Sequence, residues 1–294
     1  MSPRDIALAL VVVVLWGLSF IAIKLGVGVA PPLLLTALRF FFAALPAVFF
    51  VKPPKVKLSI LVLYGIMTGV LQFGTVFVAI KFGMPAGLAS LLMQMQAFFT
   101  IGFAMLFLGE RPAWPQAVGA AVACLGIVVI ATERLEGAAL WPFLLTLFSA
   151  ASWGVANIAT KRAGRIDMFA YVAWSSLVSP IPLVLASLLL EGPAADWAAL
   201  TRGGWTLVGV VSFNAYAATL VGFGLWSALL ARYPASTVAP FSLLVPVVGI
   251  GAGIIFLGER VSLFEAVGSA VIFLGLLVNV FGPKLLVRTR PSAA

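Results

Sequence analysis

Ten long apolar runs, separated by short connectors, constrain this chain more than any other feature. Each run is close to the roughly 20 residues that an α-helix needs to cross a bilayer. Only 9% of the 294 residues are charged, far below the share of about a quarter in soluble domains. The chain is therefore predicted to be an all-α integral membrane protein with ten transmembrane helices, over residues 6–26, 32–51, 58–80, 85–108, 113–132, 140–160, 168–190, 204–229, 235–257 and 262–282.

The chain also contains an internal duplication. The letters FLGER occur at 107–111 and at 256–260, and 13 of the 24 positions that begin there are identical at an offset of 149. Near the start of each half, Trp16-Gly17 matches Trp153-Gly154. Each half holds five spans, and because five is odd the second copy must enter the membrane from the opposite face. We therefore expect two inverted repeats, residues 1–137 and 138–294, an arrangement common in secondary transporters.

The distribution of basic residues predicts the orientation. Of the 18 Lys and Arg, 12 fall on the side of the N-terminus when alternate connectors are followed, and Arg39 lies within a span. The positive-inside rule then places both termini in the cytoplasm. The net charge of +9 comes from residues scattered between apolar runs, so we expect the bilayer rather than nucleic acid as the partner. The five basic residues on the other side are Lys24, Lys81, Arg134, Arg202 and Arg260.

The residue inventory argues against an enzyme. There is no histidine, and Cys124 is the single cysteine, so the usual proton shuttle and a thiolate metal site are both missing. The sequence has no Gly-rich phosphate loop. We expect no catalytic residues, no metal and no cofactor. All nine carboxylates fall at span ends or in connectors, so we expect uniport or exchange without a buried carboxylate that relays protons.

These features together resemble a known family. The two five-span halves, the Trp-Gly near the start of each, the lysines eight residues later (Lys24 and Lys161), Arg39-Phe40 in the second span and the repeated Gly-Glu-Arg are similar to the EamA-type branch of the drug/metabolite transporter superfamily. The resemblance covers essentially the whole chain. It implies a bacterial inner-membrane carrier that exports amino acids or related metabolites, and the pattern is similar to the branch that exports aromatic and other neutral amino acids.

Polar residues within the spans indicate a binding site, because polar groups in hydrocarbon are costly and usually face a cavity or another helix. On the first span Trp16, Phe20 and Lys24 share one helical face, and Trp153 and Asn157 repeat that face on the sixth. For Lys24, attraction of a substrate carboxylate and snorkelling to the membrane surface remain alternatives. Spans 1, 3, 4, 6, 8 and 9 are expected to line a central cavity. The other candidate substrate-binding residues are Gln72, Phe73, Phe77, Met93, Gln94, Gln96, Asn214, Phe223, Trp226 and Ser242. For the glutamines, hydrogen bonding between helices is the alternative.

A second group is predicted to be structural or to gate transport. Pro240 and Pro246 remove backbone hydrogen bonds and are expected to kink the ninth span. Arg39 lies too deep to remain unpaired, so we expect carbonyls or a carboxylate of a neighbouring helix beside it. Gly109 and Gly258 are placed to end helices. After them, Glu110-Arg111 and Glu259-Arg260 are expected to form an ion pair or a cap at a tight turn.

The sequence therefore predicts a monomeric exporter that works by alternating access. Its substrate would be a small amphipathic metabolite, with neutral amino acids, including aromatic ones, as the first choice. An exporter of cationic drugs is one alternative, although it would need a membrane-embedded glutamate. A lipid scramblase is an alternative of another class, and it would move lipid without saturable flux of a solute.

Overall fold

The computed structural model describes residues 1–136, 140–164 and 166–288, and every regular element within them is helical. Ten helical stretches in these ranges are long and apolar enough to cross a membrane. Their ends lie within about four residues of the predicted ones, so the predicted fold class is confirmed. The predicted boundary between the halves, at 137/138, lies outside the described residues, as do Arg165 and Arg290 of the charge count.

The first five spans are built from nine helices and short helical segments. Span 1 is a single helix with Ser2 at its N-cap, where the hydroxyl accepts from the backbone N–H of Asp5. Spans 3 and 4 each change helix type near their middle. The elements are α1 (Pro3–Val29), α2 (Pro32–Phe50), α3 (Leu58–Gly65), η1 (Ile66–Gly74), α4 (Thr75–Lys81), α5 (Ala86–Leu92), η2 (Met93–Met95), α6 (Gln96–Leu108) and α7 (Trp114–Glu136).

The second five spans follow a similar plan, but span 7 is divided into two helices where span 2 is one, and two further short helices are present. The connector after span 7, between the predicted spans 168–190 and 204–229, forms a short helix, α11 (Pro193–Arg202). Its Asp196 is buried and accepts from the Ser187 hydroxyl at 2.7 Å, which ties α11 to span 7. The other elements are α8 (Leu140–Ala163), α9 (Met168–Ser175), α10 (Pro180–Leu190), α12 (Gly204–Ser212), η3 (Phe213–Val221), α13 (Gly222–Arg232), α14 (Ala235–Val238), η4 (Ala239–Leu244), α15 (Val245–Leu257) and α16 (Leu263–Arg288).

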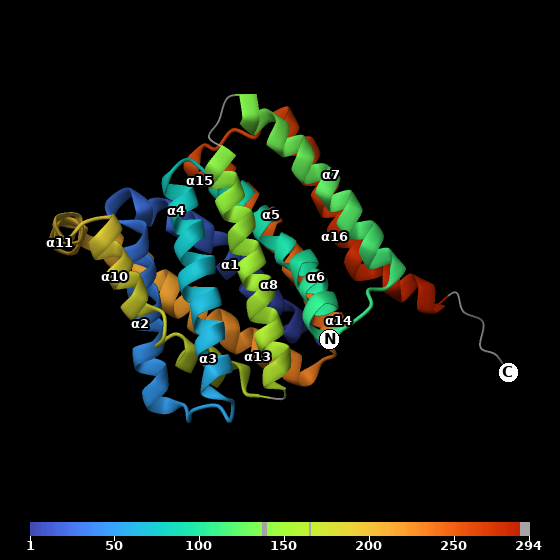
Figure 1. The fold of residues 1–294 in the computed structure, drawn as a ribbon, viewed down its shortest axis with the longest axis horizontal. Helices are drawn as coiled ribbons and strands as arrows, with labels where there is room; N and C mark the ends of the chain where they lie inside the picture. Colours follow the sequence, from blue (N-terminus) through green and yellow to red (C-terminus); the bar gives the residue numbers. More distant parts are fainter. Residues whose placement is uncertain (137–139, 165, 289–294) are drawn as a thin grey trace.

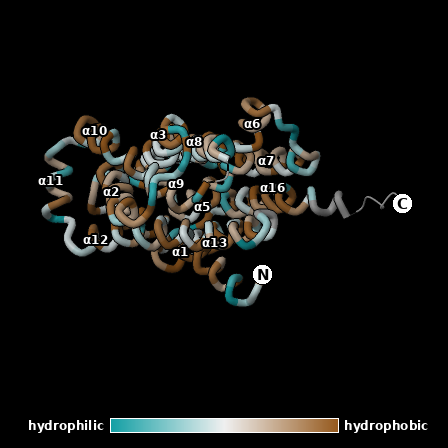
Figure 2. The backbone as a smooth tube through the Cα atoms, turned by 90° about the horizontal axis from the view of Figure 1, so that it is seen from below, coloured by the Kyte–Doolittle hydropathy of each residue, from teal (hydrophilic) through white to brown (hydrophobic). Residues whose placement is uncertain are grey.

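Spans 5 and 10 form a pair at one edge of the bundle. Figure 1 and Figure 2 both show α7 and α16 side by side there, with α11 at the opposite edge. A Cβ added at Gly119 would lie 2.6 Å from the Gly275 carbonyl oxygen, and one at Gly126 would lie 2.6 Å from that of Gly268. The four glycines correspond at the offset of 149. Such reciprocal contacts are expected where two copies of one segment face each other across a two-fold axis.

Four irregular segments occupy corresponding places in the two halves. The segments η1 in span 3 and η3 in span 8 are π-helical, and η2 in span 4 and η4 in span 9 are 3₁₀-helical. Pro240 lies at the start of η4 and Pro246 directly after it, in the first turn of α15. The predicted irregularity of span 9 therefore falls at its prolines. Span 4 changes helix type in the same place without a proline, and its sequence carries no such signal.

Spans 4 and 9 end as predicted. Gly109 and Gly258 adopt the left-handed conformation, with φ of 67° and 63°. The amides of Glu110 and Glu259 then donate back to the carbonyls of Ala104 at 3.2 Å and Gly253 at 3.1 Å. This hydrogen bond across a left-handed glycine is a common helix termination.

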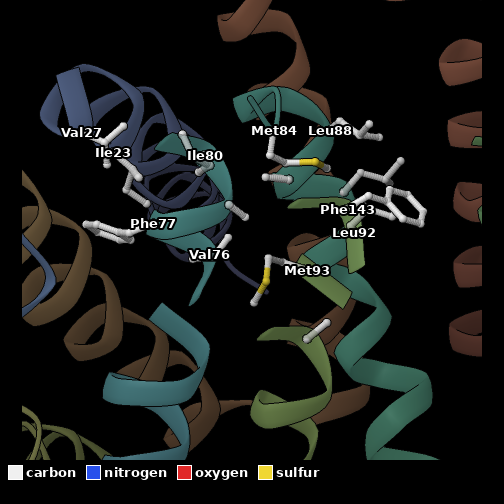
Figure 3. Packing of buried hydrophobic residues seen from close by; sticks show 14 of the residues in the cluster. Ile23, Val27, Val76, Phe77, Ile80, Met84, Leu88, Leu92, Met93 and Phe143 are labelled. Carbon is white, nitrogen blue, oxygen red and sulfur yellow. The ribbon is translucent and has the colours of Figure 1, made fainter. Parts of the chain in front are cut away.

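A cluster of apolar side chains lies in the half of the bundle that contains the C-terminal ends of α1 and α4. It includes Ile23, Val27, Ile80 and Met84, all at most 4% exposed. Figure 3 shows these side chains meeting between α1, α4 and α5. The ammonium groups of Lys24 and Lys81 reach the carbonyls of Ile80 and Val27 at this end, and the buried apolar side chains of the cluster close it.

Candidate functional site

A cavity with a volume of about 340 Å³ lies in the centre of the bundle. Its walls come from spans 1, 2, 3, 4, 6, 7, 8 and 9, and among the residues that the structure describes no lining residue comes from α7 or α16. Val76 and Met93 form its boundary with the apolar cluster, which closes it on that side. In the other direction it reaches Thr160, Met168 and Leu230, close to the helix ends. The cavity is thus closed toward one end of the bundle and extends to the other.

Aromatic side chains from spans 1 and 8 form one wall. The Trp16 ring lies 5.3 Å from the ring of Phe223 and 5.2 Å from that of Trp226, centroid to centroid. The Trp16 indole N–H donates to the Ala218 carbonyl at 3.0 Å. Ala218 lies in the π-helical segment η3, where the wider turn changes the backbone hydrogen-bond pattern. The irregular helix thereby fixes the orientation of an aromatic lining residue.

Amide side chains connect the helices in another part of the lining. Gln94 on η2 donates to the Ser242 carbonyl on η4 at 2.7 Å. Asn157 on α8 donates to the Gln96 side-chain oxygen at 2.7 Å and to the Thr100 hydroxyl at 2.9 Å. Gln94, Gln96, Asn157 and Ser242 also line the cavity. For Gln94 and Gln96 the two alternatives were a place in the cavity and hydrogen bonding between helices. Both side chains do both, since they make hydrogen bonds between helices and also line the cavity.

Arg39 lines the cavity and is buried, with 3% of its surface exposed. Its two terminal nitrogens donate to the Asn214 side-chain oxygen and the Thr219 hydroxyl, each at 3.2 Å. The guanidinium carbon lies 3.9 Å from the centroid of the Phe73 ring. The expected neighbours were carbonyls or a carboxylate of another helix. The observed ones are an amide oxygen, a hydroxyl and an aromatic face, all uncharged.

Most of the residues proposed from the sequence are brought together at this cavity. The lining set includes Trp16, Phe20, Gln72, Phe73, Met93, Gln94, Gln96, Trp153, Asn157, Phe223, Trp226 and Ser242.

Three of the proposed residues lie outside the cavity. Lys24 is directed to the closed end, where its ammonium donates weakly to the Ile80 carbonyl at 3.4 Å. Phe77 is fully buried in the apolar cluster. Asn214 lies behind Arg39 and holds the guanidinium. For Lys24 the shared helical face with Trp16 and Phe20 was not sufficient, because the lysine meets a different neighbour one turn further along the helix.

Two spans that the sequence interpretation left out also contribute. Span 2 supplies Arg39 and Phe40, and span 7 supplies Met168, Val172, Ser175 and Ser176. The signal for span 2 was present, because an arginine two turns into a span is rare unless it faces a bundle interior. Span 7 offered only small hydroxyls, which are equally common where helices pack. Thr68, Ser90 and Thr160 were missed for the same reason, and Tyr64 was missed as well.

The two copies of FLGER differ in their contacts. Glu259 accepts from the backbone amides of Ala86 at 2.6 Å and Gly87 at 3.0 Å, and so caps the start of span 4. Glu110 instead pairs with Lys161 at 2.7 Å, with about half of each side chain exposed. The predicted cap is thus found in one copy and an ion pair in the other. Arg111 and Arg260 are both exposed.

Ten membrane-crossing helices, eight of which line a buried, partly polar cavity, define a multi-pass membrane protein of the transporter class. The sequence matches the model of the EamA-like transporter family over residues 4–132 and again over 140–281. The chain belongs to this family, which confirms the resemblance drawn from its motifs.

Individual relatives agree with this assignment. The chain is 44% identical over 288 residues to a "Probable amino-acid metabolite efflux pump" of Escherichia coli (strain K12), covering 96% of each chain. It is 30% identical over 268 residues to a "Probable terminal-alkyne amino-acid exporter" of Streptantibioticus cattleyicolor, covering 88% of this chain and 87% of the relative. A solved crystal structure with 20% identity matches with a TM-score of 0.66 over 100% of both chains, which shows the fold alone.

Proposed function

We propose that this protein exports small amphipathic metabolites, with neutral amino acids, including aromatic ones, as its first substrates. The cavity is the observation that carries this proposal. Its volume of about 340 Å³ is at the lower end of the range of small-molecule sites, and aromatic walls with a few placed polar groups are typical of them. The relatives named as amino-acid metabolite and amino-acid exporters support the same substrate class.

The mechanism that fits this shape is alternating access. The cavity is closed at one end by the apolar cluster and extends toward the other, which is the form of one of two states of such a carrier. We place the chain in a bacterial inner membrane with both termini in the cytoplasm, so this state faces the cytoplasm. The two segments matched by the family model support the division into inverted halves at 1–137 and 138–294. A monomer contains the whole cavity.

Transport is proposed to be uniport or exchange. Arg39 is the only charged side chain among the lining residues in the part of the chain that the structure describes. A proton relay through a lining carboxylate is therefore not part of the proposal. Purified protein in liposomes would test this, since uphill accumulation of substrate driven by an imposed pH gradient would contradict it.

Occlusion of the cavity tests the function itself. Ser227 lines the cavity on α13, so Ser227→Trp is expected to fill part of the space and lower counterflow of radiolabelled phenylalanine in proteoliposomes by about tenfold or more. Leu189→Trp on α10 is the matched control, because Leu189 is 83% exposed on the outside of the bundle. Saturable counterflow that both variants retain would contradict the proposed site. Lipid movement without saturable solute flux would instead support a scramblase.

A further inference from the structure

The charge of Arg39 is not balanced by the protein around it. Its two hydrogen-bond partners, Asn214 and Thr219, are neutral, and the ion pairs in the described residues join other side chains. A buried cation without a counter-charge is unfavourable in a membrane interior. The face of Phe73 at 3.9 Å offsets part of this cost as a cation–π contact, but a ring carries no net charge.

The guanidinium also retains unused hydrogen-bonding capacity. An arginine has five N–H donors, and two contacts to protein acceptors are made here. Its Nε is buried and has no partner. Asn214 and Thr219, both on η3, hold the terminal nitrogens in place, and Asn214 in turn donates to the Val210 carbonyl at 3.0 Å. The group is therefore fixed, charged and incompletely bonded at the wall of a binding cavity.

A second unpartnered atom lies on the same wall. Gln72 is 2% exposed and lines the cavity, and its side-chain oxygen is buried without a donor. Gln72 and Phe73 are neighbours on η1, and Phe73 is the ring that contacts Arg39. The lining thus contains a cation and a neutral acceptor that are linked through Phe73, which follows Gln72 on η1 and contacts Arg39. These groups are complementary to a ligand with a carboxylate, an adjacent N–H and an apolar side chain.

We propose that Arg39 is the carboxylate anchor of this transporter and that the cavity selects amphipathic monocarboxylates by net charge. This inference rests on the proposed function and narrows its substrate class. With no acidic side chain in the lining set, a monoanion neutralises the site, a zwitterion leaves it with one positive charge, and a cation adds a second. N-acylated amino acids are therefore bound more tightly than free neutral amino acids, and amino-acid amides and amines are excluded.

Binding to the wild-type protein tests this ranking without a variant. Four probes share one ring and differ in charge: N-acetylphenylalanine, phenylalanine, phenylalaninamide and phenethylamine. Ligand-induced thermal stabilisation of the purified protein reports binding whether or not transport follows. The first two are expected to stabilise the protein, with the N-acetyl compound acting at about tenfold lower concentration, and the two cations are expected to have no effect. Equal stabilisation by the acid and the amide would overturn the proposal.

Variants of Arg39 then test whether this residue causes the preference for the acid over the amide. Arg39→Gln removes the charge and is expected to reduce the preference for the acid over the amide to about twofold or less. Arg39→Lys keeps the charge but loses the planar fork, so it should retain the preference with weaker binding. If Arg39→Gln is not stable enough to purify, Arg39→Lys is compared with wild type across the four probes. The assignment to Arg39 is then supported if Arg39→Lys binds the acids more weakly than wild type while it retains the preference for acid over amide. A wild-type acid preference that Arg39→Gln retains would overturn the assignment.

Transport measured with the same probes separates this proposal from the function on which it rests. Binding that follows the charge ranking, with no flux of any probe, would contradict the exporter and leave the anchor intact. Saturable flux of phenylalanine and phenylalaninamide at equal rates would support the exporter and contradict the anchor.

Discussion

Replacing Gly126 with leucine is expected to lower the melting temperature of the purified protein by roughly 5 °C or more. Gly126 lies where α7 crosses α16, and a Cβ there would be 2.6 Å from the Gly268 carbonyl oxygen and 2.9 Å from the Ile272 amide nitrogen. Both atoms belong to the backbone, so no side-chain rotation relieves the clash. The two helices would have to separate along the contact that joins them most closely.

A glycine on another span provides the control. A Cβ added at Gly251, in the middle of α15, meets nothing within 4 Å, so Gly251→Leu is expected to leave the melting temperature within about 2 °C of wild type. Thermal unfolding in detergent, followed by the loss of the monodisperse peak on size-exclusion chromatography, measures both. Equal melting temperatures for the two variants would show that the α7–α16 contact contributes little to stability.

The spans could be predicted because the bilayer imposes one length and one composition on all of them. The positions at which the helix type changes within a span could not be predicted. The sequence of η1, from Ile66 to Gly74, differs little in composition from an ordinary apolar helix, and a π-helical turn depends on contacts made by other helices. Only η4 had a local signal, because Pro240 cannot donate a backbone hydrogen bond.

The cavity could be predicted in part because amides and aromatic residues within spans seldom face lipid. This principle selected Trp16, Gln94 and Asn157, which do line it. It failed for Lys24 because two positions on one helical face can meet different neighbours. The lysine lies one turn closer to the membrane surface than Phe20 and meets the Ile80 carbonyl instead of open space.

The different roles of Glu110 and Glu259 were also beyond local sequence. The repeat places both glutamates in the same five-residue stretch, FLGER, and the partners of Glu259 are 172 and 173 residues away. Whether each glutamate caps a helix depends on how the two halves are arranged, which a repeated motif alone does not encode. In this structure the cap is made at the closed end of the cavity and the exposed ion pair lies at the other.

Loss of the Glu259 cap is expected to open the closed end. The carboxylate accepts hydrogen bonds from two backbone amides at the first turn of α5. Hydrogen bonds to a charged group contribute about 1.5–3 kcal/mol each to stability. Glu259→Gln removes the charge and one acceptor oxygen. If the closed form thereby loses about 2 kcal/mol of stability relative to the open form, the population of the open form rises about 30-fold. Met84 is 1% exposed behind this cap. In a Cys124→Ala background, Met84→Cys should therefore react with a membrane-impermeant maleimide at least about tenfold faster when Glu259→Gln is present.

The repeat supplies the matched control. Glu110→Gln makes the same chemical change in the same motif but disrupts an ion pair that is about half exposed, which contributes roughly 1 kcal/mol or less. It lies at the opposite end of the bundle, so labelling at Met84→Cys should stay within about twofold of the background rate. Equal acceleration by both glutamate variants would indicate general loosening of the fold. No acceleration by Glu259→Gln would mean that the apolar cluster of Ile23, Val27 and Ile80 keeps this end closed without the cap.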